Sequence, residues 1–162
     1  MIFIFVASVA VAVEPDTQTE RLSAIVRDLI APAPRHRFHC DIALAEFIRD
    51  VQAASAEAPD VSAEKLLAVA FLESSFDPRA RGTIGEIGIM QIHGVAAQGC
   101  DLRTQRGQLI CGARLLQAGI EEYGSWRGSL TRYATGRCRS KSDRVRRIVN
   151  HRVRFAEKLE GE

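Results

Sequence analysis

Apolar residues recur at the three- and four-residue spacing of an α-helix along most of the chain. The clearest stripe runs through residues 106–123, where Leu109, Ala113, Leu116 and Ile120 would share one face. The same spacing predicts helices over residues 17–30, 41–54, 62–73, 106–123, 126–135 and 142–159. Serine, threonine or aspartate stands at the start of several of these segments, where such residues cap helices.

Helix-breaking residues separate these segments. The stretches "APAPR" (31–35) and "EAPD" (57–60) end the first two helices. Four glycines lie close together in the middle of the chain: Gly82, Gly85, Gly88 and Gly94. They predict a loop or hairpin, with a short helix around "GIMQI" (88–92). The expected fold class is therefore mainly α, with at most a small β-hairpin.

The chain length of 162 residues is enough for one compact domain. The composition, 46% apolar and 26% charged, is typical of a globular protein and excludes wholesale disorder. We expect an apolar leader at 1–13, an N-terminal arm or linker at 14–38, a main domain at 39–140, and a basic helix at 141–162. This last helix would pack on the main domain or extend it.

The opening "MIFIFVASVAVAV" is an uncharged run of thirteen residues before Glu14. A membrane-spanning helix needs about 20 residues, so the run suits the core of a signal peptide. Ala10-Val11-Ala12 offers a cleavage site, although no Lys or Arg precedes the run. We expect export to the periplasm, with an uncleaved membrane anchor or a buried N-terminal segment as the alternatives.

Four cysteines are present: Cys40, Cys100, Cys111 and Cys138. An even number in an exported chain suggests two disulfides, which can be connected in three ways. Cys100 and Cys111 flank a short polar segment, so we favour that pair, which leaves Cys40 with Cys138. Four reduced thiols in a cytosolic protein are the alternative.

The stretch "LLAVAFLESSFDP" (66–78) places Glu73 at the end of a helical run that carries no other charge after Lys65. The negative end of a helix and apolar neighbours such as Phe71, Phe76 and Met90 both disfavour a carboxylate. A carboxyl group kept protonated in this way can act as a general acid. An ordinary surface glutamate near a helix end is the simpler alternative.

Asp77 and Glu86 are the nearest candidates for a second catalytic carboxylate. Asp77 precedes Pro78, where capping a turn is the simpler role. The histidines, at 36, 39, 93 and 151, do not have the spacing of a metal site. We expect neither a metal nor a cofactor.

Three segments, "LLAVAFLESSFDPRA", "GEIGIMQI" and "LTRYATG", occur in this order. Together they resemble the catalytic domain of the soluble lytic transglycosylases, of the small specialised type, which has a goose-lysozyme-like helical fold. That family carries an E-S pair at a helix end, then a G-L-M-Q segment, then a tyrosine in an A-Y-N-like segment. The resemblance extends from about residue 41 to residue 139, and it implies that the main domain is the catalytic domain.

The resemblance implies a reaction on peptidoglycan in which one glutamate does two jobs. Glu73 would protonate the oxygen between MurNAc and GlcNAc, and its carboxylate would then take the proton of the MurNAc C6 hydroxyl. That hydroxyl closes on C1 and leaves a 1,6-anhydro sugar, with the N-acetyl group of the substrate stabilising the charge at C1. The small specialised members serve secretion systems, conjugation systems, flagella or phage particles, where they open the cell wall locally.

The resemblance also assigns supporting residues. Tyr133 matches the tyrosine that hydrogen-bonds the catalytic glutamate, and Ser74 matches a residue that positions backbone and substrate. Gln91 matches a contact to the sugar N-acetyl group, and Met90 matches its apolar neighbour, which lines the cleft. Gly85 and Gly88 would let the backbone approach the glycan. A half-buried core tyrosine is the alternative for Tyr133.

Three positions depart from the family pattern. Ala134 replaces an asparagine, Gly82 stands where many members have serine, and Glu86 stands where a small residue is usual. Two competing functions therefore stay open. One is a muramidase on the same fold, with hydrolysis assisted by Asp77, by Glu86 or by the position of a bound water. The other is a structural or peptidoglycan-binding subunit without activity.

The C-terminal region is strongly basic, with eight Lys or Arg residues between Arg137 and Arg154 against the single acid Asp143. Arg144, Arg147 and His151 could share one helix face. A solvated surface is the plainest interpretation. Attraction to an anionic surface, either peptidoglycan carboxylates or phospholipid, is the second. Nucleic acid is the least favoured partner, and we expect membrane contact only through the N-terminal segment.

Overall fold

The computed structural model describes residues 17–33, 36–136 and 142–161, which form six α-helices and two short 3-10 helices. These are α1 (Thr17–Ile30), η1 (Arg37–His39), α2 (Asp41–Ala56), α3 (Ala63–Ser74), η2 (Gly94–Ala97), α4 (Gln105–Tyr123), α5 (Trp126–Thr135) and α6 (Asp143–Gly161). All six long helices agree with the predicted segments to within two residues. The short helix expected at residues 88–92 is wrong: that segment forms turns, and η2 follows it.

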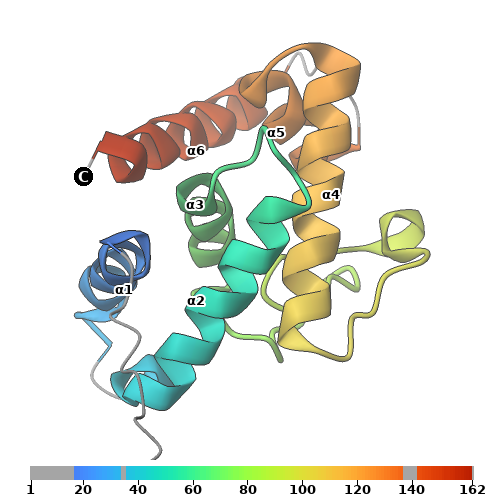
Figure 1. The fold of residues 1–162 in the computed structure, drawn as a ribbon. Coiled ribbons are helices and arrows are strands. Elements are labelled where there is room, and N and C mark those ends of the chain that lie inside the picture. The colour runs from blue at the N-terminus through green and yellow to red at the C-terminus, as the bar shows by residue number, and fades with distance from the viewer. Residues whose placement is uncertain (1–16, 34–35, 137–141, 162) are drawn as a thin grey trace, which may run out of the picture.

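Helix α3 lies in the middle of the molecule, surrounded by α1, α2, α4 and α6 (Figure 1). Its residues from Leu66 to Ala70 are all buried because neighbours cover it on several sides. The uncharged run that the sequence shows here is thus the central element of one hydrophobic core. Ser62 caps the start of α3 by accepting the backbone N–H of Lys65 at 3.2 Å.

The segment predicted as an N-terminal arm is instead part of the fold. Helix α1 buries Leu22, Ile25, Val26 and Ile30 in the common core. Arg21 also forms an ion pair of 2.9 Å with Glu64 on α3. The prediction of a loose arm was wrong, because α1 packs against α2, α3 and η1 and its apolar stripe is buried in the common core. The sequence of a short helix does not show whether distant elements cover it.

The chain leaves α3 through two consecutive residues with left-handed backbone, Ser75 (φ 50°) and Phe76 (φ 66°). Such a pair is costly for residues with a Cβ, and three interactions hold it. The Phe76 ring is fully buried among other phenylalanines. His36 donates from Nε2 to the Ser75 carbonyl at 2.9 Å, and Arg37 donates to the Phe76 carbonyl at 3.1 Å.

The glycine-rich loop between α3 and α4 contains only isolated bridges, Arg81 with Ile87 and Ile87 with Ile92, so the expected hairpin is reduced to a fragment. A disulfide between Cys100 and Cys111 ties this loop to the first turns of α4, as predicted. None of the helices in the described part of the chain has the length and apolar character to cross a membrane. The predicted leader at 1–13 lies outside the described residues.

Candidate active site

Glu73 lies in the last turn of α3, with its side chain 16% exposed. Its Oε1 accepts a bond of 2.6 Å from Nη2 of Arg152 on α6, whose side chain is 13% exposed. The pair therefore joins two helices in a region largely shielded from water, where charge-assisted hydrogen bonds are strong. Sequence reasoning did not select Arg152, because it is one of many basic residues on a basic helix.

The ionisation of Glu73 is set by opposing interactions. Burial raises the pKa of the Glu73 carboxyl above its ordinary value, because desolvation penalises the charged form. The guanidinium of Arg152 acts against this rise, and the negative charge of Glu86 adds to it. The direction agrees with the requirement for a general acid, and burial is its main cause.

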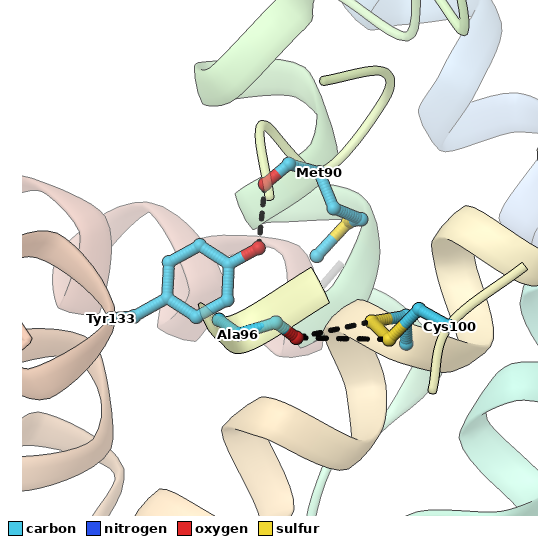
Figure 2. The surroundings of a disulfide bond; sticks show 5 residues. Met90, Ala96, Cys100 and Tyr133 are labelled. Carbon is cyan, nitrogen blue, oxygen red and sulfur yellow. Dashed lines mark hydrogen bonds between the residues drawn. A yellow bond between two sulfur atoms is a disulfide. The ribbon is translucent and has the colours of Figure 1, made fainter. Parts of the chain in front are cut away.

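Tyr133 on α5 is close enough for the Glu73 charge to raise its pKa, although burial is the larger cause of that rise. Its hydroxyl donates to the carbonyl oxygen of Met90 at 2.5 Å (Figure 2). The resemblance implied a hydrogen bond from this tyrosine to the catalytic glutamate. In this structure the hydroxyl instead supports the backbone of the loop, and Arg152 contacts Glu73.

Met90 also differs from its predicted role. Its side chain is fully buried and packs against Gly112 of α4, where an added Cβ would come within 2.6 Å of the Met90 side chain. A residue in this position cannot line an open cleft, so its contribution is to anchor the loop. The following residue, Gln91, has left-handed backbone (φ 46°) and donates from Nε2 to the Gly88 carbonyl at 2.8 Å. That bond orients the predicted sugar-binding amide.

Gln108 on α4 is an organising residue that the sequence did not reveal. Its side chain is buried, accepts the Ile89 N–H at 2.9 Å, and donates to the carbonyls of Pro78 and Leu102. A Cβ on Gly88 would lie 2.1 Å from its Oε1. Gly88 is therefore required by Gln108 and by its own positive φ of 74°, rather than by an approaching glycan. The one available signal was a glutamine on the apolar face of a helix.

Ser74 links the catalytic helix to the same loop. Its Oγ lies 2.8 Å from the Ile89 carbonyl, to which it donates, and 3.2 Å from the Ala70 carbonyl. This position fits the backbone part of the predicted role. Gly85 is exposed with φ 97°, and its approach to a glycan stays a prediction.

The two additional carboxylates have different surroundings. Asp77 accepts the Arg79 N–H at 2.9 Å and lies 3.8 Å from the Arg79 guanidinium, which is the arrangement of a turn cap. Glu86 accepts the Ile84 N–H at 3.1 Å and is close enough to influence Glu73. Of the two, Glu86 is the one whose negative charge acts on the pKa of Glu73.

The structure contains one of the two predicted disulfides, Cys100–Cys111. The carbonyl oxygen of Ala96 lies 3.7 Å from the sulfur of Cys100 and 3.9 Å from that of Cys111 (Figure 2). Cys40 has a free, exposed thiol, and Cys138 lies outside the described residues. The structure therefore does not support the predicted Cys40–Cys138 disulfide. Within the described ranges, no three histidine, cysteine or acidic side chains are grouped as a metal site.

The family model of the transglycosylase SLT domain matches residues 50–148, which is more than half of the chain. The chain belongs to this family. The match runs from α2 through α3, α4 and α5 to the first turns of α6, and it includes Glu73, Gln91 and Tyr133. No curated protein and no solved structure matches the chain.

Membership in the SLT domain family accounts for the mainly α, lysozyme-like fold and indicates a transglycosylase that acts on peptidoglycan. The described residues outside the match are those before residue 50, which include α1, η1 and the start of α2, and the part of α6 that carries Arg152. The SLT domain of this chain thus has a partner for its candidate acid that the family match does not include.

Proposed function

We propose that the protein is a peptidoglycan lytic transglycosylase that cleaves the MurNAc-β-1,4-GlcNAc bond and leaves a 1,6-anhydroMurNAc end. The observation that carries this proposal is Glu73, a shielded carboxyl with a raised pKa at the end of α3 in an SLT domain. Cleavage of a glycosidic bond requires proton delivery to the leaving oxygen. Glu73 is the acid suited to that step.

The proposed reaction uses Glu73 twice. Its carboxyl group protonates the glycosidic oxygen as the bond from that oxygen to MurNAc C1 breaks. The resulting carboxylate then accepts the proton of the C6 hydroxyl as O6 bonds to C1, so Glu73 returns to its protonated form without water. The substrate N-acetyl group supports the charge at C1, and Gln91 binds that group. The hydrogen bond that holds the Gln91 amide on the loop supports this role.

A muramidase is the second candidate, and Glu86 is the observation that favours it. An inverting hydrolase needs a second carboxylate far enough from the acid to activate a water molecule. The negative charge of Glu86 raises the pKa of Glu73, so the two carboxylates lie in the same region of the molecule. Asp77 is less suited to this role, because its carboxylate already accepts the Arg79 N–H and lies beside the Arg79 guanidinium.

The test is mass analysis of the products from purified peptidoglycan digested by the full chain. Transglycosylase products are lighter by one water than hydrolysis products. We expect anhydro ends from the wild type, and a rate about 10²- to 10⁴-fold lower with Glu73→Gln, the range for losing a general acid. Glu86→Gln is the matched control and should keep most activity. Reducing ends that disappear with Glu86→Gln would identify a muramidase instead, and no products from folded wild type would favour a binding subunit.

We also propose that the protein is exported to the periplasm. There it would open the cell wall locally for a secretion, conjugation, flagellar or phage assembly. The apolar run at 1–13 and the Cys100–Cys111 disulfide support export, because disulfides persist in oxidising compartments. Fractionation of expressing cells, with N-terminal sequencing of the recovered chain, tests both export and cleavage. Recovery in the cytosol with reduced cysteines would overturn this part of the proposal.

A further inference from the structure

The contact between Arg152 and Glu73 joins residues that are 79 positions apart in the sequence. The guanidinium belongs to α6, and the carboxylate belongs to α3. With side chains 13% and 16% exposed, both charges have lost most of their hydration. Each would be costly to bury alone, so the pair has to be considered as one unit.

The guanidinium is held in place by the packing of its helix. Val149, Val153 and Ala156 surround Arg152 in the sequence of α6, and all three are buried. Phe155 stacks on Phe71 of α3, with ring centroids 5.9 Å apart. Because this face of α6 is fixed to α3, Arg152 is presented to Glu73 by rigid elements rather than by a loop.

The second terminal nitrogen of Arg152, Nη1, is buried and has no hydrogen-bond acceptor among the described residues. An unpaired buried donor is unfavourable. Nη2 of the same guanidinium lies 2.6 Å from Oε1 of Glu73, so the ion pair with Glu73 is the interaction that holds this buried charge.

Among the described residues, three elements bring charged or titratable groups to Glu73. They are Arg152 from α6, Tyr133 from α5, and Glu86 from the loop between α3 and α4. The Tyr133 hydroxyl is engaged by the Met90 carbonyl, and Glu86 repels a carboxylate. Arg152 is thus the group that can hold the ionised form of Glu73.

We propose that Arg152 is a positioning residue of the active site, which fixes the Glu73 carboxylate and stabilises its ionised form. This rests on the proposed function. In the first half of the reaction Glu73 gives its proton to the glycosidic oxygen as the C1–O bond breaks. Arg152 then faces the new carboxylate until the C6 hydroxyl returns a proton to it and O6 closes on C1. The guanidinium neither gains nor loses a proton.

The direct test is a ¹³C NMR titration of the Glu73 side-chain carboxyl in the full-length protein. Removing the guanidinium with Arg152→Met should raise the Glu73 midpoint by about one to three pH units, the usual effect of an opposite charge. Arg152→Lys should keep the midpoint near that of the wild type. Arg154→Met, an exposed site on the same helix, removes the same charge away from Glu73 and should leave the midpoint unchanged.

The pH dependence of cleavage is the second readout. Activity that needs protonated Glu73 falls as the pH rises through its pKa, so this limb should move to higher pH in Arg152→Met by the same amount. A loss of activity with the limb unmoved would mean a merely structural role and would overturn the proposal. An unchanged carboxyl midpoint in folded Arg152→Met would also overturn it.

The titration separates this inference from the proposed function, since it requires no turnover. An inactive wild type with the expected midpoint shift would remove the proposed function and retain the ion pair. If Arg152→Met does not fold, ¹⁵N spectra of the Arg152 guanidinium in wild type and Glu73→Gln decide the matter. Slowed exchange of its protons that is lost in Glu73→Gln supports the pairing, and identical spectra contradict it.

Discussion

The carboxylate of Glu86 occupies the space directly above Gly82. A Cβ added to Gly82 would lie 2.0 Å from Oε2 of Glu86 and 2.8 Å from its Cβ. These are two of the positions at which the chain departs from the family pattern. The structure shows that they depart together, because the larger side chain at 86 needs the missing side chain at 82.

The pairing predicts non-additive stability. Gly82→Ala should force Glu86 away from the Ile84 N–H and cost about 1–3 kcal/mol, the usual range for overpacking. Glu86→Ala opens that space, so the double variant should be more stable than the sum of the single changes predicts. Urea denaturation of the four proteins measures the coupling, and additivity within about 0.5 kcal/mol would contradict the prediction.

Removing Arg152 should destabilise the protein more at high pH than at low pH. Burial raises the pKa of Glu73 in the folded protein, so the associated stability is present below the unfolded pKa and is lost as the pH rises through the folded pKa. Arg152→Met removes the opposing interaction and raises that pKa further. At pH values above the folded-state pKa of Glu73, the additional loss of unfolding free energy should be about 1.4 kcal/mol for each unit by which the substitution raises that pKa.

Unfolding free energies at pH 4 and pH 8 test this dependence on pH. Arg154→Met serves as the control, because it removes an exposed charge from the same helix. Its stability difference from the wild type should vary little with pH. Equal losses for Arg152→Met at both pH values would mean that the ion pair does not influence the titration of Glu73.

Tyr133→Phe should destabilise the glycine-rich loop without shifting the pH at which Glu73 titrates. The change removes the donor to the Met90 carbonyl, which should cost about 1–3 kcal/mol, the penalty for an unpaired buried group. Cleavage should fall by less than in Glu73→Gln, and the pH at which activity declines should stay where it is. A marked shift of that pH would show that the hydroxyl bonds Glu73 during the reaction.

A chain that begins at residue 35 should fail to fold cooperatively. It would lose Leu22, Ile25, Val26 and Ile30, which are at most 4% exposed. Each such side chain contributes about 1.5–3 kcal/mol, and a typical domain is stable by only about 5–15 kcal/mol. A chain that begins at residue 14 is the control and should melt like the full protein. Matching melting curves for the two truncations would refute the assignment of α1 to the core.

Periodicity and local signals were sufficient for the helices of this protein. The stripe of residues 106–123, the Ser62 cap and the left-handed Gly124 after α4 each depend on neighbours a few positions away. Glu73 could be selected for the same reason: the uncharged run before it is visible in one line of sequence. The Cys100–Cys111 pair is also local, with a separation of 11 residues.

Tertiary structure decided what surrounds Glu73. Arg152 on α6 and Gln108 on α4 reach the site from distant parts of the chain. Arg152 is one of many basic residues on its helix, and the only sequence signal for Gln108 is a glutamine on an apolar helix face. The sequence predicted Met90 and Tyr133 as parts of the site, but their contacts depend on how α4 and α5 pack on the loop. The sequence by itself determined where the helices form and which carboxyl group is the candidate acid. Only the packing of the helices, which sets distances between residues far apart in sequence, decided that an arginine holds that acid.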